Sequence, residues 1–132
     1  KSLDRNVSIL KLFPGISEPV VDSILSTPEL KAVILETFGS GNAPTKEWFI
    51  KRLEKAIDSG ITILNVTQCK EGSVEIGRYS TSVEMGRIGI IGGKDITTES
   101  ALTKLMYLLG AGYSGTEVVS LLQKSLRGEI TI

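Results

Sequence analysis

Short apolar runs alternate with stretches of helical periodicity along this chain, and that alternation restricts the fold more than any other feature. The apolar runs are "VSILKLFPG" (7–15), "AVILETF" (32–38), "ITILNVTQC" (61–69) and the brief "GIIGG" (89–93). Strands that are apolar nearly throughout are typical of parallel sheets covered on both faces. We therefore expect an α/β fold, a three-layer sandwich with a small parallel sheet of about four strands flanked by helices.

The segments between and after these runs have the residue pattern of helices. The expected helices are "EPVVDSIL" (18–25), "TKEWFIKRLEKAIDSG" (45–60), a short one near residues 81–86, "TTESALTKLMYLLG" (97–110) and "SGTEVVSLLQKSLRG" (114–128). Ser17 stands in a capping position before the first helix. Gly60, Gly110 and Gly128 stand where three of the others should stop. No internal repeat divides the chain, so residues 1–132 are expected to form a single domain.

The charge balance and the residues that are missing exclude several functional classes. Lys and Arg together number 15, as do Asp and Glu, so there is no basic excess for a nucleic-acid partner. No apolar run is long enough to span a bilayer, so we expect no membrane partner. The chain has no histidine and only Cys69, which excludes Ser-His-Asp and Cys-His pairs and zinc sites within it. We expect no metal, no cofactor and a cytoplasmic location.

The chain begins with Lys1 rather than with Met, and a strand-like run follows after only six residues. That start predicts a domain excised from a longer protein. The residues upstream of Lys1 would test this expectation.

The loops after the strands should meet at one edge of the parallel sheet, where open α/β folds bind ligands. These loops are polar and rich in glycine: "PGIS" (14–17), "GSGNAPT" (39–45), "TQCKEG" (67–72) and "GGKD" (92–95). A phosphate loop is disfavoured in the second of them, because Pro44 stands where the third glycine of a dinucleotide fingerprint belongs. "GGKD" fails as a Walker A loop, since Asp95 replaces the required Ser or Thr.

Four polar residues of this edge are candidates for a site, and each has a structural alternative. The Asn42 amide suits an amide or α-amino acid ligand, but it could equally cap the following helix. Glu36 lies near the end of a buried strand, where it is either paired or just past the sheet edge in water. Thr67 and Cys69 belong, with Gln68, to a second polar cluster, although a lone cysteine without a histidine is ordinarily a small apolar residue.

Four motifs, in order and in register, carry a resemblance to a known family. They are "LETFGSGNAPT", "GITILNVTQCKEGSVEIGRY", "GIIGGKDITTESALTKLMYLLG" and "LRGEIT". With this spacing the chain closely resembles the C-terminal domain of cytoplasmic type I L-asparaginases, from "ILKLFPGI" to Ile132. The related D-type component of the archaeal tRNA amidotransferase shares the architecture but fits less well over "TQC" and "LRGE".

The resemblance implies an amidohydrolase that converts L-asparagine and water to L-aspartate and ammonia. In the family a threonine nucleophile, in a "TGGTI" loop, belongs to the N-terminal domain, and that loop is absent from this sequence. The resemblance therefore implies no catalytic residue in this chain, inactivity of the chain in isolation, and a partner in its own N-terminal domain. It also implies a homo-oligomer, a dimer or a tetramer.

Two kinds of ligand contact are implied for this domain. Asn42 matches the asparagine of the family's "GxGN" loop, which reaches toward substrate bound in a neighbouring subunit. Thr67 and Cys69 match part of an allosteric asparagine site near the domain junction. Glu36 is a departure, because bacterial members with a well-marked effector site have an arginine there; the acid would instead meet the effector's α-ammonium group. The alternatives are an effector-binding and oligomerisation module without catalytic contribution, or the C-terminal domain of an amidotransferase D-type subunit.

Overall fold

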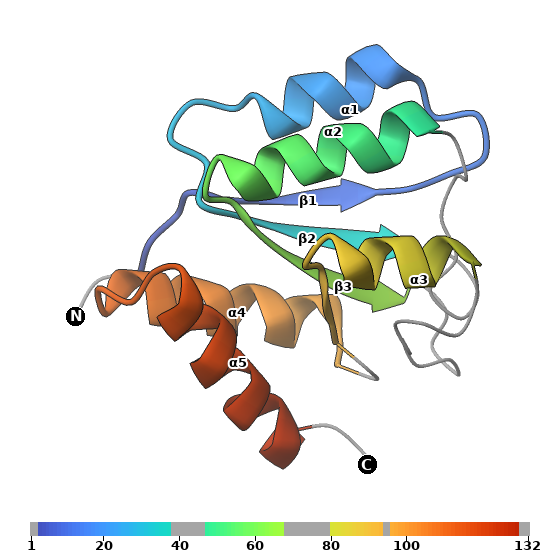
Figure 1. The fold of residues 1–132 in the computed structure, drawn as a ribbon. Coiled ribbons are helices and arrows are strands. Elements are labelled where there is room, and N and C mark those ends of the chain that lie inside the picture. The colour runs from blue at the N-terminus through green and yellow to red at the C-terminus, as the bar shows by residue number, and fades with distance from the viewer. Residues whose placement is uncertain (1–2, 38–46, 68–79, 94–95, 130–132) are drawn as a thin grey trace.

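The computed structural model describes residues 3–37, 47–67, 80–93 and 96–129, which contain nine helices and strands. In chain order these are β1 (Val7–Lys11), α1 (Glu18–Leu25), β2 (Ala32–Thr37), α2 (Glu47–Asp58), β3 (Thr62–Thr67), α3 (Ser80–Arg87), β4 (Ile91–Gly92), α4 (Thr98–Gly110) and α5 (Thr116–Glu129). Every expected strand and helix is present, and their order confirms the predicted alternation (Figure 1).

The four strands form one parallel sheet in the order β1-β2-β3-β4. Ala32 of β2 pairs with Val7 of β1 on one side and with Thr62 of β3 on the other. Because each strand is joined to the next through a helix, all strands run the same way and their carboxyl ends share one edge (Figure 1). The predicted α/β class and small parallel sheet are confirmed.

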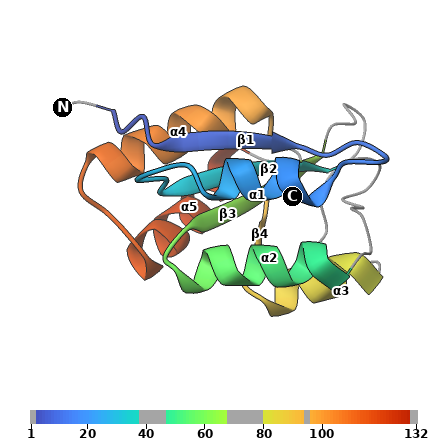
Figure 2. The same cartoon turned by 90° about the horizontal axis from the view of Figure 1, so that it is seen from above.

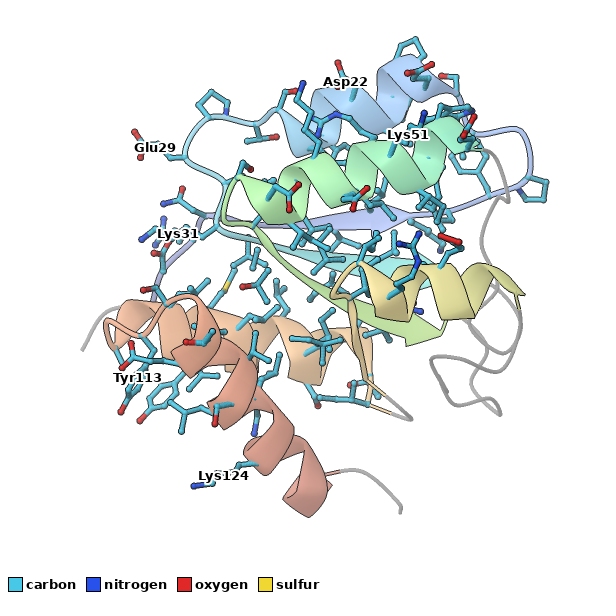
Figure 3. All side chains as sticks on the ribbon, in the orientation of Figure 1. Asp22, Glu29, Lys31, Lys51, Tyr113 and Lys124 are labelled. Carbon is cyan, nitrogen blue, oxygen red and sulfur yellow. The ribbon has the colours of Figure 1, made fainter. Side chains whose placement is uncertain are left out.

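Two apolar clusters cover the two faces of the sheet. Alternate strand residues such as Val33, Leu35 and Ile63 pack with residues of α1, α2 and α3. The residues between them, such as Ile34 and Leu64, pack with α4 and α5. Figure 1 shows α1 and α2 above the strands and α4 and α5 below them. Figure 2 looks onto the strands from the side of α1, and apolar side chains fill the space between the layers in Figure 3. Burial of one Leu or Ile side chain stabilises by about 1.5–3 kcal/mol, so the two faces together specify the three-layer arrangement.

The helix boundaries correct the sequence reading in small ways. Ser17 is the N-cap residue of α1, but its side chain makes no capping hydrogen bond. Gly60 does follow α2 with a φ of 106°, as the predicted stop requires. Helix α4 ends at Gly110, yet the left-handed residue after it is Gly112, with a φ of 96°. Helix α5 continues one residue beyond Gly128.

Candidate functional site at the carboxyl edge of the sheet

The carboxyl ends of the strands are tied together by main-chain hydrogen bonds that extend beyond the strands. The Leu12 amide, just after β1, donates to the Glu36 carbonyl at 3.0 Å. The Gly93 amide, just after β4, donates to the Asn65 carbonyl at 2.8 Å. These bonds extend the pairing of neighbouring strands one residue past the ends of β1 and β4, at the edge where the candidate residues lie.

Glu36 lies on the face of the sheet that α4 and α5 cover. Ile34, two residues earlier on the same strand, belongs to the cluster beneath these helices. The Thr98 hydroxyl donates a hydrogen bond to Glu36 Oε2, and Thr98 is the first residue of α4. The half-buried Glu36 side chain therefore complements the positive end of the α4 dipole and connects β2 to α4. The sequence reading considered pairing with a cation or with backbone N–H groups, or a position in water past the sheet edge; the hydroxyl partner on α4 is neither of these.

The start of α4 is fixed independently of Glu36. Thr97 is its N-cap residue, and the Thr97 hydroxyl accepts a hydrogen bond from the Ser100 amide at 3.1 Å. This is the usual capping contact of a helix beginning. The Thr98 hydroxyl is thus available for Glu36, because the neighbouring threonine performs the capping.

A buried polar pair lies on the opposite face of the same edge. The Thr37 hydroxyl donates to Asn65 Oδ1 at 2.9 Å, and both residues are 0% exposed. The other end of the amide, Nδ2, is buried and has no hydrogen-bond partner among the described residues. A hydroxyl can donate or accept, so one end of the Asn65 amide stays unsatisfied by Thr37 whichever way the amide is turned.

Gly93 is required by close packing at this edge. A Cβ atom there would lie 2.9 Å from the Asn65 carbonyl oxygen and 2.9 Å from Ile96 Cγ2. Its role is therefore to let the chain after β4 approach β3, which explains a glycine that fits no phosphate motif. Lys94 and Asp95 lie outside the described residues.

The structure brings together only part of the predicted site. Glu36 and Thr67 lie on the neighbouring strands β2 and β3 at the same edge, but the register partner of Glu36 is Val66 and that of Thr67 is Thr37. Asn42 and Cys69 lie outside the described residues. The roles proposed for all four as ligand contacts stay predictions.

The sequence reading missed the polar partners Thr37, Asn65 and Thr98. Asn65 had a visible signal, because it is a lone amide inside an apolar run, and a buried amide needs partners. Thr98 had none, since it lies 62 residues from Glu36 and looks like an ordinary first-turn residue.

No cluster of three or more metal-ligating side chains occurs within the described ranges. Over the same part of the chain, no helix is both long enough and apolar enough to pass through a membrane.

Comparison with known proteins defines the class to which this fold and this edge belong. The sequence profile of the glutaminase/asparaginase C-terminal domain matches residues 6–122. That range contains all four strands and four of the five helices, and the match reaches into the fifth. The chain therefore belongs to the glutaminase/asparaginase C-terminal domain family, and it is homologous to L-asparaginases.

Individual relatives confirm the resemblance found in the motifs. The chain is 41% identical over 125 residues to L-asparaginase 1 of Escherichia coli K12, covering 95% of this chain and 37% of that protein. It is 44% identical over 131 residues to the human 60 kDa lysophospholipase, covering 98% of this chain and 22% of that protein. The crystal structure of L-asparaginase I from Vibrio cholerae matches with a TM-score of 0.90 and 39% identity, over 99% of this chain and 39% of that one.

The amidotransferase alternative corresponds to more distant relatives. The D-type component of the glutamyl-tRNA(Gln) amidotransferase of Methanobrevibacter smithii is 34% identical over 128 residues, covering 97% of this chain and 29% of that protein. In every one of these comparisons the chain spans less than two-fifths of its relative's length.

Proposed function

We propose that residues 1–132 are the C-terminal domain of an L-asparaginase, which hydrolyses L-asparagine to L-aspartate and ammonia with a threonine nucleophile outside this chain. The match of 95% of the chain to L-asparaginase 1 at 41% identity supports the proposal most directly. The partners in this proposal are L-asparagine, the N-terminal domain of the same polypeptide and further copies of it. A cytoplasmic location suits a chain whose lone cysteine forms no internal disulfide.

The first test concerns the proposed location of the nucleophile in the N-terminal domain, outside this chain. The chain has no histidine and one cysteine, so it contains no conventional nucleophile–histidine pair. Ammonia release from L-asparagine should be absent with the 132-residue chain and present with a polypeptide that also carries the N-terminal domain. Turnover by the chain alone would refute the proposed location of the nucleophile.

Asn42 is proposed to position the substrate through a hydrogen bond across a subunit interface. A bond from an amide to a charged ligand group contributes about 1.5–3 kcal/mol, so Asn42→Ala should lower kcat/KM for asparagine about tenfold or more. Asn6→Ala, near the opposite end of the sheet, is the matched control and should leave kcat/KM unchanged. Equal kcat/KM values for the Asn42 variant and the wild type would reject the substrate-positioning role and leave Asn42 with a structural role.

Glu36, Thr67 and Cys69 are proposed to contribute to a second, effector site for asparagine. The position of Glu36 and Thr67 at one sheet edge supports this assignment. Calorimetry of the two-domain polypeptide with its nucleophile replaced should detect two asparagine sites per subunit. A single site would reject the effector role and leave the catalytic proposal intact.

The alternative, an effector-binding and oligomerisation module without catalytic contribution, is favoured by one specific observation. Relatives of comparable identity are named as an asparaginase and a lysophospholipase, and more distant ones as part of an amidotransferase. A domain shared by proteins with such different names is not expected to carry chemistry specific to one reaction. Two results together would support this alternative. The Asn42→Ala variant would have unchanged kinetics, and the oligomer would dissociate when the domain is removed.

A further inference from the structure

Strand β1 forms one edge of the sheet. In the described parts of the chain it pairs with β2 on one side and has no strand on the other (Figure 2). The Leu12 amide, one residue past its end, donates to the Glu36 carbonyl of β2. Main-chain groups that face a neighbouring parallel strand belong to alternate residues, so the odd-numbered residues of β1 face the other way. The amides and carbonyls of Val7, Ile9 and Lys11 therefore point out of the sheet, where a further strand can pair with them.

The β1 edge lacks most of the features that protect edge strands from pairing. Such strands are usually very short, or they carry prolines, bulges or several charges. β1 has five residues in unbroken register with β2, no proline, and a single charge at its end, Lys11. Its middle residue, Ile9, is 39% exposed. β4, at the other end of the strand order, has only two residues. Of these two strands, β1 is therefore the one that can accept a partner along its whole length.

We propose that β1 pairs with β1 of a second copy of this chain, antiparallel about a two-fold axis at Ile9. In that register Ile9 faces Ile9 of the other copy, and Val7 faces Lys11 in both directions. All three residues direct their main-chain groups outward, so each of these pairs exchanges two hydrogen bonds. The two four-stranded sheets would thus become one continuous sheet.

The charges near β1 favour this register over its neighbours. An axis at Ser8 would place Lys11 opposite Arg5, and an axis at Lys11 would bring two lysines together. Like charges directly opposite each other destabilise a strand pair. An axis at the middle residue, Ile9, avoids both contacts and pairs all the outward residues of β1 with one another.

This self-complementarity is the reason for choosing a second copy as the partner. A two-fold contact uses the same surface on both copies, so one strand that matches itself is sufficient. The inference deepens the homo-oligomer of the proposed function, because it names a surface through which the copies meet, and it rests on that part of the proposal.

A charge exchange at the axis tests the pairing in the two-domain polypeptide. Ile9→Lys and Ile9→Asp each place two like charges at the axis, so each should weaken the association about tenfold or more in sedimentation equilibrium. Co-expression of the two variants should restore the wild-type assembly, because Lys and Asp then face each other. Val20→Lys adds the same charge at a similarly exposed residue of α1, and this matched control should leave the assembly unchanged.

Three outcomes would overturn the inference. A monomeric wild type, or an assembly that is unchanged in both Ile9 variants, would exclude the β1 contact. An assembly that is lost in both variants and not restored by co-expression would mean that Ile9 meets a different surface, such as an unrelated strand or the N-terminal domain.

A pair of proline variants distinguishes loss of the contact from loss of the fold. Proline removes one main-chain N–H and is tolerated in an edge strand where that N–H faces outward. Ile9→Pro should therefore weaken the association, while Ser8→Pro removes an N–H that faces β2 and should lower the urea midpoint much further. Wild-type association of the Ile9→Pro variant, or equal midpoints for the two variants, would overturn the inference.

Asparagine hydrolysis, measured on the same variants, separates this inference from the proposed reaction. Hydrolysis by a polypeptide whose assembly does not depend on Ile9 would refute the inference and leave the reaction intact. An assembly that responds to the Ile9 variants as expected, without release of ammonia, would support the inference and refute the reaction.

Discussion

The Thr37 hydroxyl donates a 2.9 Å hydrogen bond to the Asn65 amide oxygen, between two side chains with no exposed surface. The two residues are 28 positions apart, and each lies near the carboxyl end of a central strand. The bond therefore fixes the end of β2, the last described residue before the segment that contains Asn42. Its strength should influence both the stability of the domain and the shape of the candidate site.

Replacing Thr37 by Val should destabilise the domain. Valine has nearly the same shape, but it leaves the Asn65 oxygen buried and without its hydroxyl partner, which costs about 1–3 kcal/mol. Thr37→Ser keeps the hydroxyl and is the matched control. Urea unfolding should give a lower midpoint for the Val variant than for the Ser variant, with similar slopes. A Val variant as stable as the Ser variant would show that the bond contributes nothing.

The double variant Thr37→Val with Asn65→Leu should be more stable than the sum of the single changes predicts. Removing both partners eliminates the buried unsatisfied groups, and this includes the Asn65 Nδ2 atom, which lacks an acceptor among the described residues. The coupling energy from the double-mutant cycle should fall within about 0.5–3 kcal/mol. Additive effects of the two changes would mean that the residues do not act as a pair.

Thr98→Val should lower the stability of the domain more than the loss of another threonine hydroxyl from α4 does, because Thr98 is bonded to Glu36. The Thr98 hydroxyl donates to Glu36, and a bond to a charged acceptor is worth about 1.5–3 kcal/mol before the discount for a half-buried position. In the control, Thr103→Val, the lost hydroxyl bonds only the exposed Glu99 carbonyl of the same helix. Thermal unfolding should show a lower Tm for the Thr98 variant, and partial recovery with Thr98→Ser. Equal Tm values for the Thr98 and Thr103 variants would contradict a specific link.

The arrangement of strands and helices could be predicted from the sequence, whereas the contacts at the edge could not. Apolar runs such as Ala32–Leu35 and the glycine after α2 depend on local pattern, which the sequence displays directly. The Glu36–Thr98 bond and the Lys11–Glu36 register depend on how α4 and β1 meet β2, which is a property of the assembled fold. The Ser17 hydroxyl shows the same limit, because a residue in the right place makes no capping bond.

Asp4 gives a pH-dependent prediction at the end of the sheet opposite the candidate site. The hydrogen bond from Lys31 Nζ and the one from the Asn6 amide lower the pKa of Asp4; Figure 3 shows Lys31 at the end away from the strand arrowheads. Because the folded-state pKa is below the unfolded value of about 3.9, the ionised group stabilises the fold above that pH. This contribution is lost as the pH falls through the folded-state pKa.

Asp4→Asn should therefore reduce stability near neutral pH by at most about 1 kcal/mol, as expected for a partly exposed ion pair. The difference from the wild type should shrink below about pH 4. Lys31→Met removes the other partner and should give the same pH dependence. Urea unfolding measured from about pH 7 to about pH 3 provides the comparison, and a constant difference across that range would show that Asp4 acts through packing rather than through its charge.

Gly93→Ala should destabilise the domain by overpacking the carboxyl edge. The added Cβ would lie 2.9 Å from the Asn65 carbonyl oxygen and from Ile96 Cγ2, and the first of these is main chain that cannot move aside cheaply. The cost of such overpacking is about 1–3 kcal/mol. Gly60→Ala is the comparison, because its Cβ meets nothing within 4 Å and its cost comes only from the left-handed backbone, about 1–2 kcal/mol. The two variants should differ in their effect on the carboxyl edge, because only Gly93→Ala should displace the chain just after β4. Changes in the amide chemical shifts of Asn65 and Ile96 would report this displacement. A Gly93 variant with unchanged shifts at these two residues would show that the edge tolerates the extra methyl group.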